Sequence, residues 1–289
     1  MAESLSRRTA LRVKQAMDGQ PIERGTVYVA APDRHLLLID GTVRLGEGPR
    51  ENMARPSIDP LFRSAALSYG PRAIGVILTG MLNDGASGLN SIKSVGGTAI
   101  VQHPIDAEAD QMPLAALEST NVDHVVSAAD LAGLLGQLAG SDAGPAVEPS
   151  QDLALEAEIA AGVRLGSGNL RAPADPSALS CPDCQGVLSE MRGQRPLRYR
   201  CQIGHASTAE VLASRIENVD EAVRIAMRLM EERVTLVERM ADDARQTGRP
   251  AVAELYDARA DEYRRYAATL REAATLSLQM GRAPREQEN

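Results

Sequence analysis

A short apolar run, Ile74–Leu78, constrains the fold more than any other stretch of the chain. The run is too short for a buried helix and rich in β-branched residues, so it predicts a strand that is buried on both faces. The Asn-Asp-Gly turn at residues 83–85 then leads into an apolar pattern that predicts a helix over residues 86–95. We therefore expect Asp84 between the carboxyl end of a strand and the amino end of a helix.

Asp84 is open to two interpretations at this point. An Asp-Gly pair before a helix is most often an Asx-turn or a helix N-cap, which is a structural role. Open α/β sheets, however, place their functional groups outside the carboxyl ends of the strands, where Asp84 is expected. The local pattern alone leaves both roles open.

Length and charge narrow the class of protein. The chain has 289 residues, enough for one α/β domain and a smaller module. A formal charge of -8, with six tyrosines and one phenylalanine as the only aromatic residues, argues against a nucleic-acid-binding surface. No apolar run is long enough to cross a bilayer and no signal-peptide core follows the first residues, so we expect a cytoplasmic protein without membrane insertion.

Residues 1–138 alternate between strand-like and helix-like patterns, which predicts an α/β domain with a parallel sheet and right-handed crossovers. Residues 1–18 are polar and predict no opening strand, so we expect an incomplete doubly wound sheet. Asp40-Gly41 predicts a β-hairpin. The other expected elements are strands at 27–30, 35–39, 42–45, 98–102 and 123–127 and helices at 58–67, 113–117 and 128–138.

The composition changes after residue 138. Gly, Ala, Pro, Ser and Asp dominate residues 139–180, which predicts a linker that contains one short helical segment at 153–159.

Residues 207–280 predict an α-helical hairpin. Apolar residues recur at intervals of three and four residues from Leu212 to Ala241, which predicts an amphipathic helix. A second helix is expected over residues 251–280. The two helices should pack antiparallel, and a helical partner could complete their packing. Residues 281–289 are expected to form a disordered tail.

The three cysteines fall close together and predict a metal site. Cys181 and Cys184 form a Cys-x2-Cys pair, and Cys201 and His205 follow at Cys-x3-His spacing. Three thiolates and one imidazole are a tetrahedral ligand set for zinc, so we expect a zinc-ribbon-like module over residues 181–206 with a structural ion. A redox Cys-x2-Cys pair is the alternative, but it leaves Cys201 and His205 unexplained.

A series of motifs in the first half of the chain points to a family. The motifs are Val27-Tyr-Val-Ala-Ala-Pro-Asp-Arg-His35, Arg55-Pro-Ser-Ile-Asp59, Leu61-Phe-Arg-Ser-Ala65, Gly75-Val-Ile-Leu-Thr-Gly-Met81, Asn83-Asp-Gly85 and Met112-Pro113. Together they closely resemble the catalytic domain of the chemotaxis receptor protein-glutamate methylesterases (CheB type), over roughly residues 10–138. The Cys/His module and the hairpin resemble an extension found on some family members.

The resemblance implies a Ser-His-Asp hydrolase on a doubly wound sheet, which needs no cofactor for catalysis. Such an enzyme removes methyl esters from glutamates on chemotaxis receptors or related signalling proteins and releases methanol, and related members deamidate glutamine. Asp84 matches the triad aspartate of the family, which orients the imidazole. Met81 in the same turn is expected to border the substrate site.

The chain also departs from the family pattern. The family nucleophile lies in a Gly-x-Ser-x-Gly-Gly turn and its histidine in a Val-Gln-His sequence, and both precede the part that matches from Leu11 onward. We therefore expect an N-terminally truncated domain that is inactive alone. Either the coding start lies upstream of Met1, or the chain is a shortened relative.

Three residues imitate parts of a triad without matching its positions. His103 follows a Val-Gln sequence but falls after the aspartate in the chain, so we expect it in a strand-end turn. Ser87 lies in the first turn of a helix and is expected to be structural, as is His35.

Three hypotheses of function follow. The first is a methylesterase whose remaining segment lies upstream. The second is a non-catalytic module that binds a receptor or partner through the family surface. The third is a structural role, in which the zinc module and the hairpin hold an assembly together.

Overall fold

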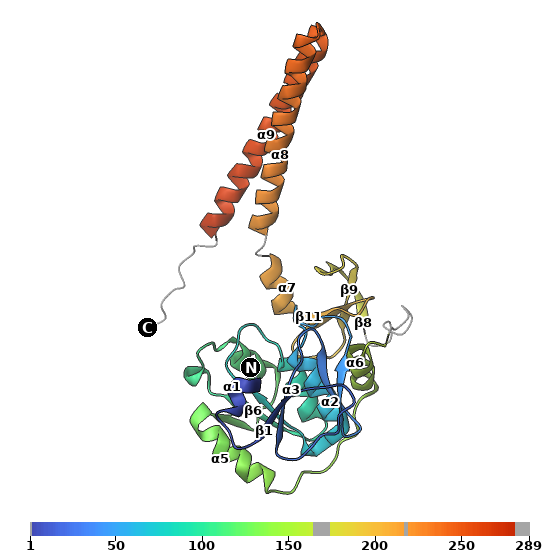
Figure 1. The fold of residues 1–289 in the computed structure, drawn as a ribbon, viewed down its shortest axis with the longest axis vertical. Helices are drawn as coiled ribbons and strands as arrows, with labels where there is room; N and C mark the ends of the chain where they lie inside the picture. Colours follow the sequence, from blue (N-terminus) through green and yellow to red (C-terminus); the bar gives the residue numbers. More distant parts are fainter. Residues whose placement is uncertain (1, 164–173, 217–218, 281–289) are drawn as a thin grey trace. The chain divides into compact units, whose positions relative to one another are not determined.

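A computed structural model describes residues 2–163, 174–216 and 219–280 of the chain. It divides into two compact units, Met1–Leu212 and Ala213–Asn289. Unit 1 contains the α/β elements and the sheet that carries the cysteines, and unit 2 is the helical hairpin (Figure 1).

The α/β part of unit 1 confirms the predicted parallel sheet. Its strands are β1 (Arg12–Gln15), β2 (Thr26–Val29), β3 (His35–Ile39), β4 (Thr42–Gly46), β5 (Ile74–Ile77), β6 (Thr98–Gln102) and β7 (His124–Val126). Strands β5, β6 and β7 pair in parallel in that order, and β3 and β4 form an antiparallel hairpin. Asp40 and Gly41 both adopt positive φ in the hairpin turn, as an Asp-Gly turn of this kind requires.

The helices of the α/β part are α1 (Ala2–Ser6), α2 (Ile58–Tyr69), η1 (Gly70–Arg72), α3 (Ala86–Ser94), η2 (Pro104–Asp106), α4 (Gln111–Ser119) and α5 (Ala128–Ala139). Three of them, α2, α3 and α4, bury one face in the core. Ile77, Leu89 and Val101 bring β5, α3 and β6 into one apolar core. A Cβ at Gly88 would lie 2.7 Å from the Cβ of Phe62, so glycine permits the close packing of α3 on α2. Helix α5 buries no residue and lies at the margin of the unit (Figure 1).

The expectation that residues 1–18 contain no strand is wrong. Strand β1 pairs in parallel with β2, from Arg12 opposite Thr26 to Gln15 opposite Val29. Its sequence, Arg-Val-Lys-Gln, has one apolar residue and none of its side chains is buried. Backbone hydrogen bonds rather than apolar burial therefore hold this strand, and a search for apolar alternation could not find it.

The expected linker over residues 139–180 contains two ordered elements. Helix α6 (Gln151–Ala161) covers the predicted segment and buries Leu153, Glu156 and Ile159. Strand β8 (Ala174–Ser180) belongs to the sheet that carries the cysteines. The Cys/His module thus begins before residue 181.

The Cys/His module is a four-stranded antiparallel sheet in the order β11-β10-β9-β8. Its other strands are β9 (Val187–Met191), β10 (Arg198–Cys201) and β11 (Ala206–Thr208). Cys181, Leu188 and Cys201 form its small buried core. This sheet belongs to the same compact unit as the α/β part.

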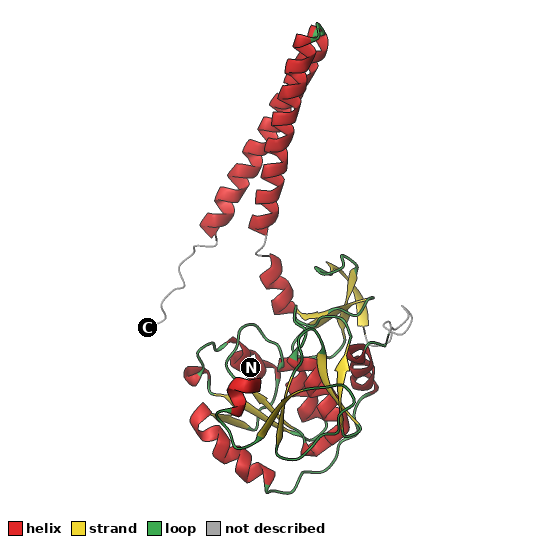
Figure 2. Cartoon of the chain, viewed as in Figure 1, coloured by secondary structure: helices red, strands yellow, loops and turns green. Residues whose placement is uncertain are grey.

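Unit 2 is the predicted helical hairpin (Figure 2). Helices α8 (Val219–Gln246) and α9 (Pro250–Met280) run antiparallel, as the ion pairs Arg245–Asp257 and Glu231–Arg271 require. The helix expected from Leu212 to Ala241 corresponds to α7 (Ala209–Ile216) and α8, and residues 217–218 between them lie outside the described residues. The expected tail at 281–289 lies outside the described residues. Among the described helices, none is both long and apolar enough to span a membrane.

Candidate functional site

Asp84 lies where the sequence places it, between the end of β5 and the start of α3. Gly85 follows with a φ of 90°, and a Cβ there would lie 2.5 Å from Cδ1 of Ile77. Only glycine suits this position, because the backbone is left-handed and the strand packs directly against it. The turn therefore fixes the direction in which the Asp84 side chain leaves the backbone.

The half-buried carboxylate of Asp84 binds the amino end of helix α2. Its Oδ2 accepts a hydrogen bond from the backbone N–H of Ile58 at 2.7 Å, and its Oδ1 accepts one from Oγ of Ser57 at 2.6 Å. Weaker bonds come from the Asp59 N–H at 3.3 Å and from Nδ2 of Asn52 at 3.4 Å. Asp84 thus caps a helix other than its own, since the Ser57 side chain makes no capping bond itself.

Asp59 is a second carboxylate at this site and is fully buried. Its oxygens accept hydrogen bonds from the Gly88 N–H at 2.7 Å and from Nδ2 of Asn52 at 2.9 Å. Burial and the neighbouring charge of Asp84 raise the pKa of Asp59 to about 6. The site therefore holds two carboxylates whose environments differ.

The end of the Cys/His sheet contacts the turn that carries Asp84. Oγ1 of Thr208 donates to Oδ1 of Asn83 at 2.9 Å, and Nδ2 of Asn83 donates to Glu210 at 2.8 Å. The Thr208 N–H also donates to Oδ1 of Asn52 at 3.2 Å. Both asparagines next to the carboxylates are therefore held by the last strand of the Cys/His sheet and the first turn of the helix after it.

His35 and Ser57 lie near Asp84 without forming a triad. Nδ1 of His35 accepts a bond from the backbone N–H of Ser57 at 3.3 Å, and Nε2 bonds to the carbonyl of Pro49 at 2.9 Å. Burial lowers the pKa of His35. In a triad the imidazole bonds both the serine hydroxyl and the carboxylate, whereas here the hydroxyl bonds the carboxylate directly. His35 is structural.

The other candidates form no described hydrogen bond with Asp84. His103 is exposed, and its Nδ1 accepts the Ile105 N–H at 3.2 Å at the start of η2. Ser87 is buried in the first turn of α3, and no hydrogen bond within the described chain joins it to a histidine. Met81 is 70% exposed in the loop after β5, so its side chain is free to contact a bound molecule.

Below the turn lies a cluster of five charged side chains, each at most 2% exposed. The buried ion cluster comprises Glu51, Arg63 of α2, Glu156 of α6, and Arg198 and Arg200 of β10. It joins the α/β part to the Cys/His sheet.

Several short ion pairs hold the buried ion cluster together. Glu156 lies 2.8 Å from Nη1 of Arg198 and 3.1 Å from Nε of Arg63, and Glu51 lies 3.3 Å from Arg200. Burial opposes the charge on Glu156, but the guanidinium groups of Arg198 and Arg63 outweigh it and lower the pKa of Glu156 to about 2. Both glutamates are therefore ionised.

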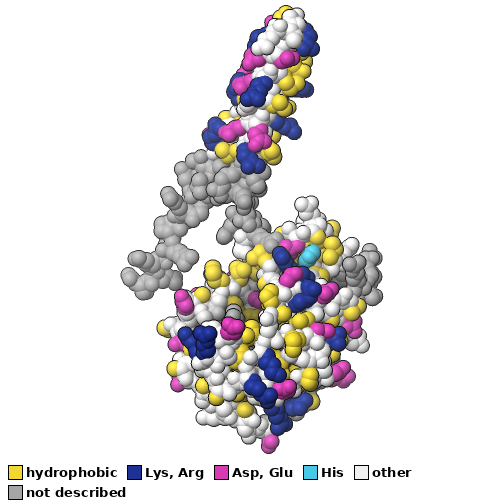
Figure 3. Space-filling model, viewed as in Figure 1, with side chains coloured by type: hydrophobic (Ala, Val, Ile, Leu, Met, Phe, Trp, Pro, Cys, Tyr) yellow, Lys and Arg dark blue, Asp and Glu magenta, His cyan; other side chains and the backbone are white. Residues whose placement is uncertain are grey.

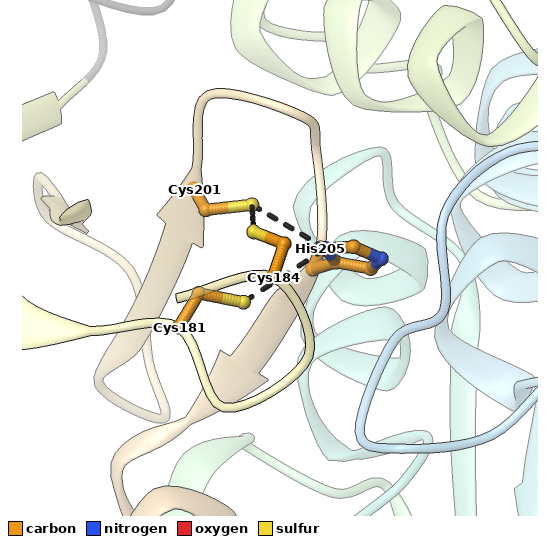
Figure 4. Close-up of side chains that lie close together, drawn as sticks. All are labelled: Cys181, Cys184, Cys201 and His205. Atoms are coloured by element: carbon orange, nitrogen blue, oxygen red, sulfur yellow. Dashed lines mark hydrogen bonds between the residues drawn. The ribbon is translucent and has the colours of Figure 1, made fainter. Parts of the chain in front are cut away.

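The four predicted metal ligands converge at one point of the Cys/His sheet (Figure 4). Their ligand atoms all lie within 4.8 Å of one another, with Cys184 Sγ 3.6 Å from Cys201 Sγ. His205 presents Nδ1 at 3.5 Å from Cys201 Sγ and 3.8 Å from Cys181 Sγ. The first pair lies in the turn between β8 and β9, and the second pair flanks the turn between β10 and β11.

This arrangement fits a tetrahedral metal ion. Ligands about 2.3 Å from a zinc ion at tetrahedral angles lie about 3.7 Å from one another, which matches the observed separations. Burial raises the pKa of the Cys181 thiol to about 12 and lowers the pKa of His205. The imidazole is thus neutral and ready to bind, while the thiolates require a cation to balance their charge.

Sequence reasoning did not identify the residues that hold the site together. Arg198 and Arg200 alternate on β10 and face the same side, which is an unusual pattern for a buried strand face. Glu156 lies three residues from both Leu153 and Ile159 on the buried side of α6. Charges on an otherwise apolar face could have indicated a buried ion cluster, but not its partners.

The comparisons with known proteins address the part of the chain that holds Asp84. The family model for the CheB methylesterases matches residues 1–135. A relative from Leptospira interrogans is 46% identical over 129 residues, which is 44% of this chain and 67% of that protein. The chain belongs to the CheB methylesterase family.

Further family members match at lower identity. A protein-glutamate methylesterase/protein-glutamine glutaminase from Anaeromyxobacter dehalogenans is 40% identical over 138 residues, or 48% of this chain and 40% of that protein. The crystal structure of the CheB methylesterase catalytic domain of Thermotoga maritima is 34% identical and covers 47% of this chain and 75% of that chain, with a TM-score of 0.46. The chain therefore spans two thirds of one curated relative and less than half of another.

Proposed function

We propose that this chain supplies the carboxylate of a Ser-His-Asp hydrolase that removes methyl esters from glutamates of signalling receptors, with Asp84 as that carboxylate. The geometry of Asp84 supports this most strongly. Its carboxylate is held by Ser57 and by the amino end of α2, yet Oδ2 accepts one hydrogen bond from the described residues. A second lone pair on Oδ2 is open to an imidazole N–H.

In this mechanism Asp84 accepts the Nδ1–H of the catalytic histidine and stabilises the imidazolium that forms when the serine attacks. Methanol leaves from the ester carbonyl, and water then releases the glutamate. The same site would release ammonia from glutamine. Met81, exposed beside the turn, would contact the receptor segment that carries the ester.

We propose further that residues 1–289 alone hydrolyse no ester at an enzymatic rate. Among the described residues, no histidine lies within hydrogen-bond distance of Asp84. The test measures methanol release from a methylated receptor by this chain, and by this chain fused to a family segment that carries Gly-x-Ser-x-Gly-Gly and Val-Gln-His. We expect release by the fusion only. Release by the chain alone, or none by a folded fusion, contradicts the proposal.

A non-catalytic binding module is the second candidate. The hydrogen bonds of Thr208 and Glu210 to Asn83 favour it, because they attach the C-terminal part of unit 1 directly to the turn before Asp84. Under this alternative, the fusion stays inactive while the chain still binds receptor. The same methanol assay therefore separates the two functions.

For the Cys/His module we propose one structural zinc ion held by Cys181, Cys184, Cys201 and His205. Four protein ligands fill a tetrahedral shell, which leaves no position for a substrate or a reactive water. Elemental analysis of the purified chain should give close to one equivalent of zinc. A stoichiometry near zero in a folded protein contradicts the site.

Methylated chemotaxis-type receptors or related signalling proteins are the partners that this proposal requires. A cytoplasmic location is consistent with three cysteines that form no disulfide. Binding of the chain to a methylated receptor fragment, measured by isothermal titration, tests the partner independently of hydrolysis.

A further inference from the structure

The residues buried between the two helices of the hairpin are small. Its buried positions are mostly alanines, namely Val237, Ala241, Ala244, Ala253, Ala260 and Ala267. Ala253, Ala260 and Ala267 recur every seven residues, so one small side chain per heptad faces the other helix. The two helices therefore pack closely without their larger apolar side chains.

Some of the larger apolar side chains line an open groove on one face of the hairpin. This apolar groove has a volume of about 320 Å³ and is lined by Leu236 and Met240 of α8 and by Val252 and Tyr256 of α9, together with Arg239, Asp243, Ala244 and Arg249. Leu236 is 59% exposed and Met240 38%. Figure 3 shows apolar side chains reaching the surface of the described part of the hairpin between basic ones.

The opposite face is closed by ion pairs between the helices. Glu231 with Arg271, Glu238 with Arg264, and Arg245 with Asp257 repeat at seven-residue intervals along both helices. Each arginine of this ion-paired face thus has a carboxylate on the other helix. The two faces therefore differ. The charges of the ion-paired face are neutralised within the hairpin, whereas the groove exposes apolar side chains.

Two arginines beside the groove form no ion pair with the described residues. Arg239 lines the groove, and Arg259 lies one heptad after Val252 on the same side of α9. Neither forms an ion pair within the described residues, and Arg233 lies over the Tyr263 ring at 5.8 Å. The acidic residue in the groove lining, Asp243, is paired with Arg249 at 3.3 Å.

We propose that the apolar groove binds an amphipathic helix of a partner protein, with acidic residues on both sides of its apolar stripe. An apolar stripe at helical spacing fits a groove formed by two helices. Glutamates or aspartates beside that stripe would meet Arg239 and Arg259, which form no ion pair with the described residues of the hairpin. A second copy is the competing occupant, and sedimentation distinguishes it from a partner helix.

Fluorescence anisotropy with the full chain tests the proposal. The probe is a labelled three-heptad helical peptide with leucine at positions a and d and glutamate at positions e and g. The matched control peptide carries lysine at e and g. We expect the acidic peptide to bind about tenfold or more tightly than the basic one.

Three variants locate the binding. Met240→Glu and Arg239→Glu should each weaken binding of the acidic peptide about tenfold. Arg228→Glu should leave it unchanged, since Arg228 lies three residues before Glu231 of the ion-paired face; circular dichroism verifies that each variant keeps its helix content. Failure of both peptides to bind, equal binding of the two, or a dimer that Met240→Glu dissociates in sedimentation would each overturn the proposal.

Discussion

Arginine–carboxylate pairs hold both units together, but in two different surroundings. The buried ion cluster of unit 1 is closed to water, whereas the partners on the ion-paired face of unit 2 are 44–59% exposed. Breaking a buried pair leaves an uncompensated charge and costs about 3–5 kcal/mol, whereas an exposed pair contributes about 0–1 kcal/mol. The stability of unit 1 therefore depends on each charged residue of the buried ion cluster, whereas unit 2 tolerates the loss of one ion pair.

Removing the metal should have the largest effect and should be confined to unit 1. Cys184→Ser should reduce bound zinc from near one equivalent to near zero and unfold the Cys/His sheet, because structural zinc sites contribute on the order of 10 kcal/mol. The hairpin contains no cysteine or histidine among its described residues, so its helix signal should persist. Elemental analysis and circular dichroism measure the two effects. A variant that keeps both the metal and the sheet would disprove the ligand assignment.

Glu156→Ala should have the next largest effect. The substitution leaves Arg63 and Arg198 buried with one carboxylate fewer, and we expect the free energy of unfolding of unit 1 to fall by about 3–5 kcal/mol. Urea denaturation followed by circular dichroism measures this. A loss below about 1 kcal/mol would show that the buried ion cluster contributes no more to stability than exposed ion pairs do.

Asp59 should give unit 1 a pH dependence that unit 2 lacks. Burial first, and then Asp84, raise the pKa of Asp59 to about 6, against about 3.9 in an unfolded chain. The folded state therefore holds this proton more tightly, and the contribution of Asp59 to stability falls as pH rises from about 4 to about 6. The total loss is on the order of 2–3 kcal/mol.

The test compares the wild-type chain with Asp59→Asn at several pH values across this window. The difference in unfolding free energy should shift in favour of the variant as pH rises. Glu51 and Glu156, whose pKa values are lowered by the arginines, act in the opposite direction, and their contribution is lost only in more acidic solution. A difference that stays constant with pH would show that Asp59 does not titrate in this range.

Glu231→Ala should have the smallest effect. It removes one ion pair of the exposed face, and we expect less than about 1 kcal/mol of change in the unfolding free energy of the hairpin. The same urea titration measures it beside Glu156→Ala. A loss as large as that of Glu156→Ala would end the distinction between the two units.

The elements that could be predicted from the sequence are those whose pattern is local. The apolar run at β5, the Asn-Asp-Gly turn and the helix after it lie where their residues indicate, and so does the Asp40-Gly41 hairpin. The convergence of the four predicted metal ligands follows from their spacing, because two close pairs need only two turns to meet.

The parts that could not be predicted depend on contacts between distant residues. Strand β1 has a single apolar side chain and exists through its pairing with β2. Arg198 and Glu156 become acceptable in the interior only when they meet each other, forty-two positions apart. The capping of α2 by Asp84 could not be predicted either, because the carboxylate precedes one helix and caps another.

The central claim is that Asp84 orients a catalytic imidazole, and its most direct measurement is kcat for methanol release by the fused, active protein with and without Asp84→Asn. Asparagine keeps an acceptor for the Ile58 N–H but carries no negative charge to stabilise the imidazolium, so we expect kcat to fall about 10⁴-fold with the fold intact. A variant that retains its helix content and loses less than about tenfold in kcat would show that Asp84 is a helix cap and no part of the reaction.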